Sequence, residues 1–425
     1  MFITAERLGS AIATLPWRTP VADWPKDLLV GLPRGISRHV VRFVELAGEV
    51  VAVKETEDPV AEREHEMLRA LVRLDVPAVA PLGHVTERCT PEGEHLPGAL
   101  LTPHLRYSLP YRALFSQDLA AAVADRLVDA LAVLLVRLHL AGFFWGDVSL
   151  SNALFRRDAD AFAAYLVDAE TGELHLSLSD GQREHDLEIA RTNIAGDFLD
   201  LQAGELVDAS VDPLAVSTRL LERYRALWQE LTGSEEFRED ERWRMDDRVR
   251  RLNDLGFDLG ELTVTTDLDG VTTRIEPKVV EPGHHTRRLR RLTGIGAQDN
   301  QARRMLNDLD SYRMATGLAD ADELASAEAW MADVYRPVVD TLPADSAQRL
   351  EPAQLFHEFL DHRWYMSENA GRDVSTPEAI RSYVETVLPH HRREESYLRE
   401  PSTEALQAIR SADPTSPESA ISEGS

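Results

Sequence analysis

The sequence predicts an α+β protein, with a small β-rich lobe, a helix-rich lobe and then a mostly helical C-terminal domain that contains a β-hairpin. Runs of β-branched residues between 28 and 57, separated by a glycine turn, are typical of strands joined by a hairpin. From about residue 116 onward, most segments repeat their apolar residues at helical spacing. An Asp-Gly turn between strands at 262–266 and 271–277 predicts the second hairpin.

Each expected element follows from a local pattern of the same kind. In the first half of the chain we expect extended residues at 28–30, strands at 40–46, 50–54, 98–102, 153–155 and 165–167, and helices at 60–74, at 116–140 and from about 184. In the second half we expect helices at 214–231, 238–254, 297–315, 321–341, 352–369 and 376–388.

These elements suggest four segments along the chain. They are an N-terminal helical segment at 1–27, a first domain at 28–205, a mostly helical C-terminal domain at 214–395 and a disordered tail at 401–425. Gly204 and the Asp212-Pro213 pair interrupt the pattern at the domain boundary. The tail is polar and rich in serine and proline, which is the composition of disordered segments.

Composition excludes several classes of protein. The 425 residues are enough for two domains with their own cores, and the formal net charge of -27 argues against broad nucleic-acid binding. The lone Cys89 excludes an intrachain disulfide and a multi-cysteine metal site. No secretory signal opens the chain, and charged residues interrupt the most apolar stretch, 127–145, which therefore predicts a buried helix rather than a membrane span. We expect a cytoplasmic protein.

The strongest chemical pattern lies between residues 138 and 168. A buried helix ends at a glycine, and Gly146-Asp147 follows; Asn152 comes five residues after the aspartate, and Asp168 closes the second of two short strands. Phosphoryl transfer needs this set of groups, because one carboxylate accepts the proton of the attacking hydroxyl while an amide oxygen and a second carboxylate hold Mg²⁺.

A second pattern lies upstream, at the end of a strand. Only three residues of the chain are lysines, and one of them, Lys54, closes the run Val-Ala-Val-Lys. The helix that follows offers Glu62, Glu64 and Glu66 as partners for this ammonium. The alternative is that Lys54 and these acids are solvated surface charges.

Together these residues resemble the protein-kinase superfamily, in particular its lipopolysaccharide (Kdo/heptose) kinase-like and aminoglycoside-phosphotransferase-like branches. The resemblance implies a bilobal kinase-like domain that uses ATP and Mg²⁺. It implies that Asp147 is the catalytic base, that Asn152 and Asp168 bind the metal, and that Lys54 contacts the nucleotide phosphates while Glu64 pairs with it.

The resemblance covers residues 28 to about 200 and implies further nucleotide contacts. Gly35 and Ser37 fall in the loop that should cover the phosphates, and Leu101 and Thr102 fall where the hinge should border adenine.

The chain also departs from the kinase pattern. The phosphate loop keeps one glycine near the expected alignment, Trp145 replaces the usual histidine, and Ser149 stands where many kinases have lysine. Asp168-Ala169-Glu170 lacks the Phe-Gly of protein kinases, which argues against a conventional loop-regulated protein kinase.

Histidines elsewhere have simpler interpretations. A zinc-binding helix needs two histidines four residues apart, whereas His357 and His362 are five apart and would lie about 140° apart around a helix. His139 and Asp186 are expected to anchor the loop rather than to act in chemistry.

The basic cluster at 284–291 is either a solvated helix face or an anion site formed by Arg287, Arg288, Arg290 and Arg291. Together with the segment 355–374, this cluster resembles an uncharacterised actinobacterial C-terminal domain that is fused to lipopolysaccharide-kinase-like domains.

The leading hypothesis is an ATP- and Mg²⁺-dependent phosphotransferase that acts on a hydroxyl of a small molecule, sugar or glycoconjugate. The alternative is a pseudokinase, a nucleotide-binding regulatory or scaffolding protein, which the glycine-poor loop favours. A third reading keeps the fold but transfers a nucleotidyl group.

Overall fold

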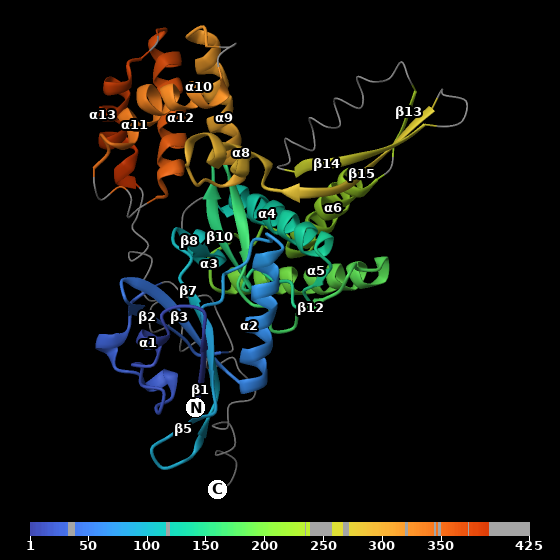
Figure 1. Cartoon of the computed structure of the whole chain (residues 1–425), viewed down its shortest axis with the longest axis vertical. Helices are drawn as coiled ribbons and strands as arrows, with labels where there is room; N and C mark the ends of the chain where they lie inside the picture. Colours follow the sequence, from blue (N-terminus) through green and yellow to red (C-terminus); the bar gives the residue numbers. More distant parts are fainter. Residues whose placement is uncertain are drawn as a thin grey trace.

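The computed structural model describes residues 1–32, 39–115, 120–233, 235–238, 257–266, 272–318, 322–343, 346, 350–372 and 374–390 (Figure 1). Along the chain it forms a small lobe, a helical lobe and a C-terminal domain. Among the helices in these ranges, none combines the length and the apolar character needed to cross a membrane.

A five-stranded antiparallel sheet forms the small lobe, with strand order β1-β4-β7-β3-β2. The strands are β1 (Phe2–Ala5), β2 (Val41–Leu46), β3 (Glu49–Thr56), β4 (Gly83–Thr86) and β7 (Gly98–Pro103). Helix α2 (Asp58–Arg73) packs against β4 and β7, while a separate apolar cluster covers the other face of the sheet. The strands expected at 40–46, 50–54 and 98–102 and the helix expected at 60–74 are confirmed.

The first 27 residues differ from the helical segment that the sequence suggested. They contain β1, the short helix α1 (Gly9–Ile12) and two 3₁₀ turns, η1 (Val21–Asp23) and η2 (Lys26–Leu28). Trp17 and Trp24 meet edge to face, with ring centroids 5.2 Å apart, and both are buried in the cluster on the outer face of the sheet. This segment therefore completes the small lobe.

The helical lobe is built around a buried central helix. Its elements are β8 (Ser108–Pro110), α3 (Tyr111–Phe115), α4 (Ala120–Leu140), β9 (Phe143–Phe144), β10 (Ala153–Asp158), β11 (Ala161–Leu166), β12 (Glu173–Leu174), α5 (Asp180–Ala203) and α6 (Pro213–Thr232). Leu131 and Leu135 of α4 are fully buried, and Leu220 and Leu227 of α6 belong to the same apolar cluster. The core of this lobe thus extends to the end of α6, beyond the boundary expected at 205–215.

The C-terminal domain has its own core, centred on Trp330, Phe356 and Tyr383. Its elements are α8 (His284–Thr293), α9 (Asp299–Ala315), α10 (Glu323–Trp330), the π-helical turn η4 (Met331–Tyr335), α11 (Arg336–Val339), α12 (Pro352–Ala370), α13 (Thr376–Thr386) and η6 (Leu388–His390). The helices expected at 352–369 and 376–388 are confirmed. The single helix expected at 321–341 is instead a succession of α10, η4 and α11.

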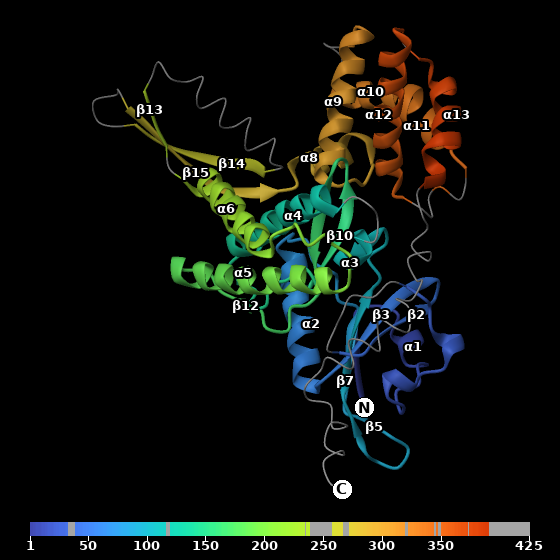
Figure 2. The same ribbon diagram turned by 180° about the vertical axis from the view of Figure 1, so that it is seen from behind.

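A sheet of order β13-β15-β14 precedes these helices, formed by β13 (Glu235–Arg238), β14 (Phe257–Thr266) and β15 (Thr272–Pro282). The expected hairpin is confirmed and is longer than the sequence indicated; Figure 2 shows it projecting away from the helical lobe. The helix expected at 238–254 and the tail at 401–425 lie outside the described residues.

The C-terminal helices sit on the helical lobe at the end marked by β10 (Figures 1 and 2). The link is the β10–β11 hairpin, whose turn contacts residues of α9 and α12. This contact between the two domains joins segments that lie about 140 to 200 residues apart in the sequence.

Candidate active site

Lys54 on β3 and Glu64 on α2 form a buried ion pair. The Lys54 Nζ atom lies 3.1 and 3.0 Å from the two carboxylate oxygens of Glu64. Glu64 is fully buried, whereas Glu62 and Glu66 are exposed. The structure therefore selects one of the three acids that the sequence offered as partners of Lys54.

Asp168 joins this pair from the end of β11. Its Oδ2 atom lies 2.8 Å from Lys54 Nζ, and its Oδ1 atom accepts a hydrogen bond from the backbone N–H of Glu170 at 3.0 Å. The Glu170 carboxylate lies 3.5 Å from the same ammonium and 2.9 Å from His39 Nε2. Three carboxylates from two lobes thus converge on one lysine.

The pKa shifts in this group follow from burial and from the shared charges. Burial raises the pKa of Glu64 to about 7, although the positive charge of Lys54 opposes the shift. Burial alone would lower the pKa of Lys54, but the charges of Glu64 and Asp168 outweigh it, so this pKa lies above its ordinary value. Burial would raise the pKa of Asp168, but Lys54 outweighs this effect and lowers it. Lys54 and Asp168 are therefore both charged at neutral pH.

Asp147 lies in the loop between β9 and β10, and amide groups hold both of its carboxylate oxygens. Asn152 Nδ2 donates to Asp147 Oδ2 at 2.9 Å and to the Asp147 carbonyl at 3.0 Å. Asn193 Nδ2, from α5, donates to Asp147 Oδ1 at 3.0 Å. The two amide groups thus fix the orientation of the carboxylate.

Asp186 on α5 anchors the start of this loop. Its two carboxylate oxygens accept hydrogen bonds from the backbone N–H groups of Trp145 and Gly146, both at 2.8 Å. His139 Nε2 lies 3.0 Å from the same carboxylate, and His139 Nδ1 lies 2.7 Å from the Tyr224 hydroxyl. These contacts tie the start of the loop to α5 and α6, which is the anchoring expected for His139 and Asp186.

Trp145, which stands where kinases usually have histidine, connects the two acidic segments. Its fully buried indole donates from Nε1 to the Asp168 carbonyl at 3.1 Å. Its own carbonyl accepts a hydrogen bond from the Thr171 hydroxyl at 2.8 Å. The loop that carries Asp147 and the segment that carries Asp168 are therefore tied together through one side chain.

The donor atoms around Asp168 fit a magnesium ion. Carboxylate oxygens of Glu64, Asp168 and Glu170 lie within 4.8 Å of one another. The amide nitrogen of Asn152 donates to Asp147, so its amide oxygen is the atom that could bind a metal ion. Carboxylate and amide oxygens are the hard donors that Mg²⁺ prefers. Asp168 and Glu170 therefore offer carboxylate oxygens suited to such an ion, and Asn152 stands at the base of the same hairpin.

Residues 44–202 match the lipopolysaccharide kinase (Kdo/WaaP) family. The match includes Lys54, Glu64, Asp147, Asn152 and Asp168, and the chain up to the end of α6 has the bilobal kinase-like fold. Residues 226–388 match a separate domain of unknown function, DUF4032. The resemblance to lipopolysaccharide kinases and the presence of a separate uncharacterised C-terminal domain are confirmed.

The solved structures that match include WaaP in complex with acyl carrier protein. That structure is 18% identical in sequence, the match covers 60% of this chain and 99% of the other, and the TM-score is 0.35. No curated protein is similar enough to this chain to count as a match.

Of the remaining candidates for nucleotide contact, Thr102 lies on the same sheet face as Lys54 and Leu101 does not. Thr102 pairs with Ala52 across β7 and β3 and, because side chains alternate along a strand, shares the sheet face of Lys54. Leu101 points to the opposite face, where it is fully buried in the cluster that contains Trp17. Gly35 and Ser37 lie outside the described residues.

Sequence reasoning missed Asn193 and His39. Asn193 comes 41 residues after Asn152 on a long helix, and no spacing rule marks an asparagine there. His39 stands just before β2, at the end of the glycine-poor segment that the resemblance assigns to the phosphates. The position of His39 beside the expected phosphate loop was the one available signal for either residue.

The basic cluster forms helix α8, and acids accompany it. Arg288 Nη2 lies 2.6 Å from Glu323, and Arg291 lies 3.8 Å from the same carboxylate. Arg287 lies 3.7 Å from Asp75 of the small lobe. These pairs support the interpretation as a solvated helix face.

His357 and His362 point to different partners. His357 Nε2 lies 3.2 Å from Asp361, and His362 Nε2 lies 2.9 Å from the Ser382 hydroxyl. The two imidazoles share no partner, as the five-residue spacing predicted.

Proposed function

We propose that the protein is an ATP- and Mg²⁺-dependent phosphotransferase that acts on a hydroxyl of a small molecule, sugar or glycoconjugate. One observation carries the proposal. Lys54 contacts both Glu64 and Asp168, and Asn152 donates a hydrogen bond to Asp147 within the loop between β9 and β10. The match to a lipopolysaccharide kinase family supports a phosphotransferase with a sugar or glycoconjugate acceptor.

Each of these residues has a separate role in the proposed phosphoryl transfer. Lys54, held by Glu64, contacts the nucleotide phosphates and neutralises part of their charge. Asp168 and Asn152 would hold Mg²⁺, which would supply positive charge to offset that of the phosphates. Asp147 orients the acceptor hydroxyl and takes its proton, and Asn193 keeps that carboxylate in place.

Nucleotide binding is tested first, by thermal unfolding of the full chain. A ligand that binds only the native state raises its melting temperature by mass action, so ATP with Mg²⁺ should do so. Lys54→Ala and Asp168→Ala should each reduce the shift. A wild-type protein that ignores millimolar ATP, ADP and GTP, with Mg²⁺ or Mn²⁺, would refute the proposal.

Catalysis is tested by Asp147→Asn, which preserves shape and removes the proton acceptor. ATP should still stabilise the variant, while turnover of ATP should fall by about 10²- to 10⁴-fold, the usual contribution of a general base. Equal turnover by the wild type and the variant would show that Asp147 is not the base. Nucleotide binding without turnover in the wild type, against a panel of phosphate acceptors, would instead support the pseudokinase alternative.

The proposal does not extend to an anionic ligand on α8. Glu323 and Asp75 lie against Arg287, Arg288 and Arg291, so acids already balance part of this positive charge.

A further inference from the structure

The β10–β11 hairpin connects the candidate site to the C-terminal domain. Asn152 directly precedes β10, and Asp168 follows β11 by two residues. The Val167 N–H donates to the Asn152 carbonyl at 3.1 Å and closes this base of the hairpin. The turn lies six paired residues away, at roughly 17 Å for strand geometry.

Asp158, at the hairpin turn, caps a helix of the other domain. Its side chain is buried, and its Oδ1 atom accepts a hydrogen bond from the backbone N–H of Gln301 at 2.9 Å. Its Oδ2 atom accepts from the backbone N–H and the side-chain amide of Asn300, at 3.2 and 2.9 Å. Both residues lie in the first turn of α9, whose N–H groups have no partners within the helix and favour negative charge.

Ala159, the next residue, has a strained backbone that the C-terminal domain holds. Its φ of +56° lies in the left-handed region, which residues with a Cβ rarely adopt. The buried Gln354 of α12 accepts from the Ala159 N–H at 3.0 Å and donates to its carbonyl at 3.4 Å. Gln301 Nε2 locks Gln354 in turn, with a bond of 2.8 Å to its Oε1 atom. Strained residues persist where their surroundings fix them in this way.

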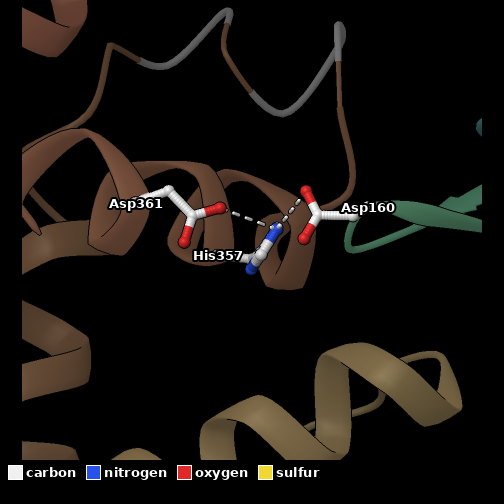
Figure 3. A group of neighbouring side chains, drawn as sticks. All are labelled: Asp160, His357 and Asp361. Carbon is white, nitrogen blue, oxygen red and sulfur yellow. Dashed lines mark ion pairs between the residues drawn. The ribbon is translucent and has the colours of Figure 1, made fainter. Parts of the chain in front are cut away.

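An ion-pair network extends this contact towards the surface. His357 Nε2 lies between two carboxylates, 3.9 Å from Asp160 of the turn and 3.2 Å from Asp361 (Figure 3). Arg304 binds both acids, at 2.9 Å from Asp160 and 2.5 Å from Asp361. The guanidinium of Arg304 already supplies the positive charge that a metal ion would bring to these two carboxylates. We therefore assign His357, Asp160 and Asp361 to holding the hairpin turn rather than to binding a metal.

The same domain reaches the end of α2, the helix that carries Glu64. Arg287 lies 3.7 Å from Asp75, just after α2. The next residues run along β11, where the Val79 N–H donates to the Leu166 carbonyl at 2.9 Å and the Leu166 N–H donates to Pro77 at 3.0 Å. The C-terminal domain therefore contacts both segments that converge on Lys54.

We propose that the C-terminal domain positions the metal-binding residues Asn152 and Asp168 by holding the far end of the hairpin that carries them. Gln354 and Asp158 are the positioning residues, and neither touches the reacting atoms. The proposal rests on the proposed function, because it assigns this domain a role in the phosphotransfer site. Buried polar groups whose hydrogen bonds are all made hold a single arrangement. Such a contact fixes the orientation of the hairpin relative to the C-terminal domain, in addition to stabilising the fold.

The test uses Gln354→Ala in the full chain, with Asp308→Ala as a matched control. Asp308 accepts the Trp330 indole N–H at 2.8 Å inside the C-terminal core and lies outside the hairpin contact. Two quantities are measured: hydrogen exchange of the amides at 152–154 and 165–168, and the Mg²⁺ concentration that gives half of the ATP-dependent thermal shift.

Gln354→Ala should speed exchange at the hairpin base by about tenfold, as expected for losing one or two buried hydrogen bonds. It should also raise the half-effect Mg²⁺ concentration severalfold. Adding Ala159→Gly should restore much of both, since glycine adopts positive φ without strain. Asp308→Ala should lower the melting temperature and change neither quantity.

Unchanged exchange and unchanged Mg²⁺ dependence in a folded Gln354→Ala protein would overturn the proposal. If that variant does not fold, Asp158→Asn, which keeps the side-chain volume, decides the question by the same measurements. A wild-type protein without any Mg²⁺-ATP response would refute the proposed function alone, because exchange at the hairpin base would still show whether the domain holds it.

Discussion

Removing the ammonium of Lys54 should make the stability of the protein depend on pH above neutrality. Glu64 is fully buried, and its pKa of about 7 already reflects burial opposed by Lys54. In Lys54→Met this opposition is lost, so the pKa of Glu64 rises further. The folded variant then keeps a proton that the unfolded chain releases, and its free energy of unfolding falls as pH rises.

The size of the effect follows from linkage. Above pH 7 the wild-type Glu64 is ionised in both states, so its contribution is constant, whereas the variant loses about 1.4 kcal/mol per pH unit. Between pH 7 and 8.5 the stability gap should widen by about 2 kcal/mol. For a domain of this size that corresponds to about 4 to 8 °C in melting temperature.

Thermal unfolding at pH 6.5, 7.5 and 8.5 measures this gap. Lys26→Met serves as the control, because Lys26 is exposed on η2 and should give a constant difference. The double variant Lys54→Met/Glu64→Gln carries no buried carboxylate at 64 and should also show a constant gap. A gap for Lys54→Met that stays constant or narrows towards pH 8.5 would refute the electrostatic account of this pair.

Three further predictions concern other parts of the chain. Asn193→Ala should lower turnover of ATP severalfold without weakening nucleotide binding, since it frees one oxygen of Asp147; an unchanged rate would remove its positioning role. Burial raises the pKa of Asp158 to about 6 against the hydrogen bonds from Gln301 and Asn300, with Asp299 adding to the shift and Arg137 also nearby, so the wild type should gain about 2 kcal/mol as pH falls from 6 to 4. Asp158→Asn should lack this gain in denaturation experiments at pH 4, 5 and 6. Replacing the four arginines of α8 with glutamine should not alter binding to anionic liposomes, phosphosugars or nucleic acid at either low or high salt, and a salt-sensitive loss would revive the anion site.

That Lys54, Glu64 and Asp168 come together, and that Asn152 contacts Asp147, was predictable from sequence because residue type and spacing constrain such a site. An aspartate, an asparagine five residues later and an aspartate after a second strand can hold one metal and one nucleophile only when the loops between them are short. The scarcity of lysine singled out Lys54 for a related reason, since so few ammonium groups are available.

The extent of the helical lobe, the shape of the N-terminal segment and the burial of Gln354 could not be predicted, because they depend on packing between distant segments. The apolar periodicity of α6 predicts a helix, but no local signal shows that Leu220 and Leu227 fill the core of the preceding lobe. The first 27 residues form short elements around Trp17 and Trp24, which take their shape from the sheet they cover. Gln354 lies on an amphipathic helix, where a glutamine usually faces solvent. It is buried because it contacts Ala159 of the kinase-like domain, which the sequence does not indicate.

Helix α6 spans the point at which the second family match begins. The DUF4032 match begins at residue 226, inside a helix that starts at Pro213 and completes the core of the kinase-like domain. A cut before α6 would expose its apolar partners on α4 and α5, and a cut after it would divide the region that the second family shares. A kinase-like domain that ends before α6 would therefore need another helix to cover this face of α4 and α5, whereas, among the described residues, the core of the C-terminal domain includes no residue of α6.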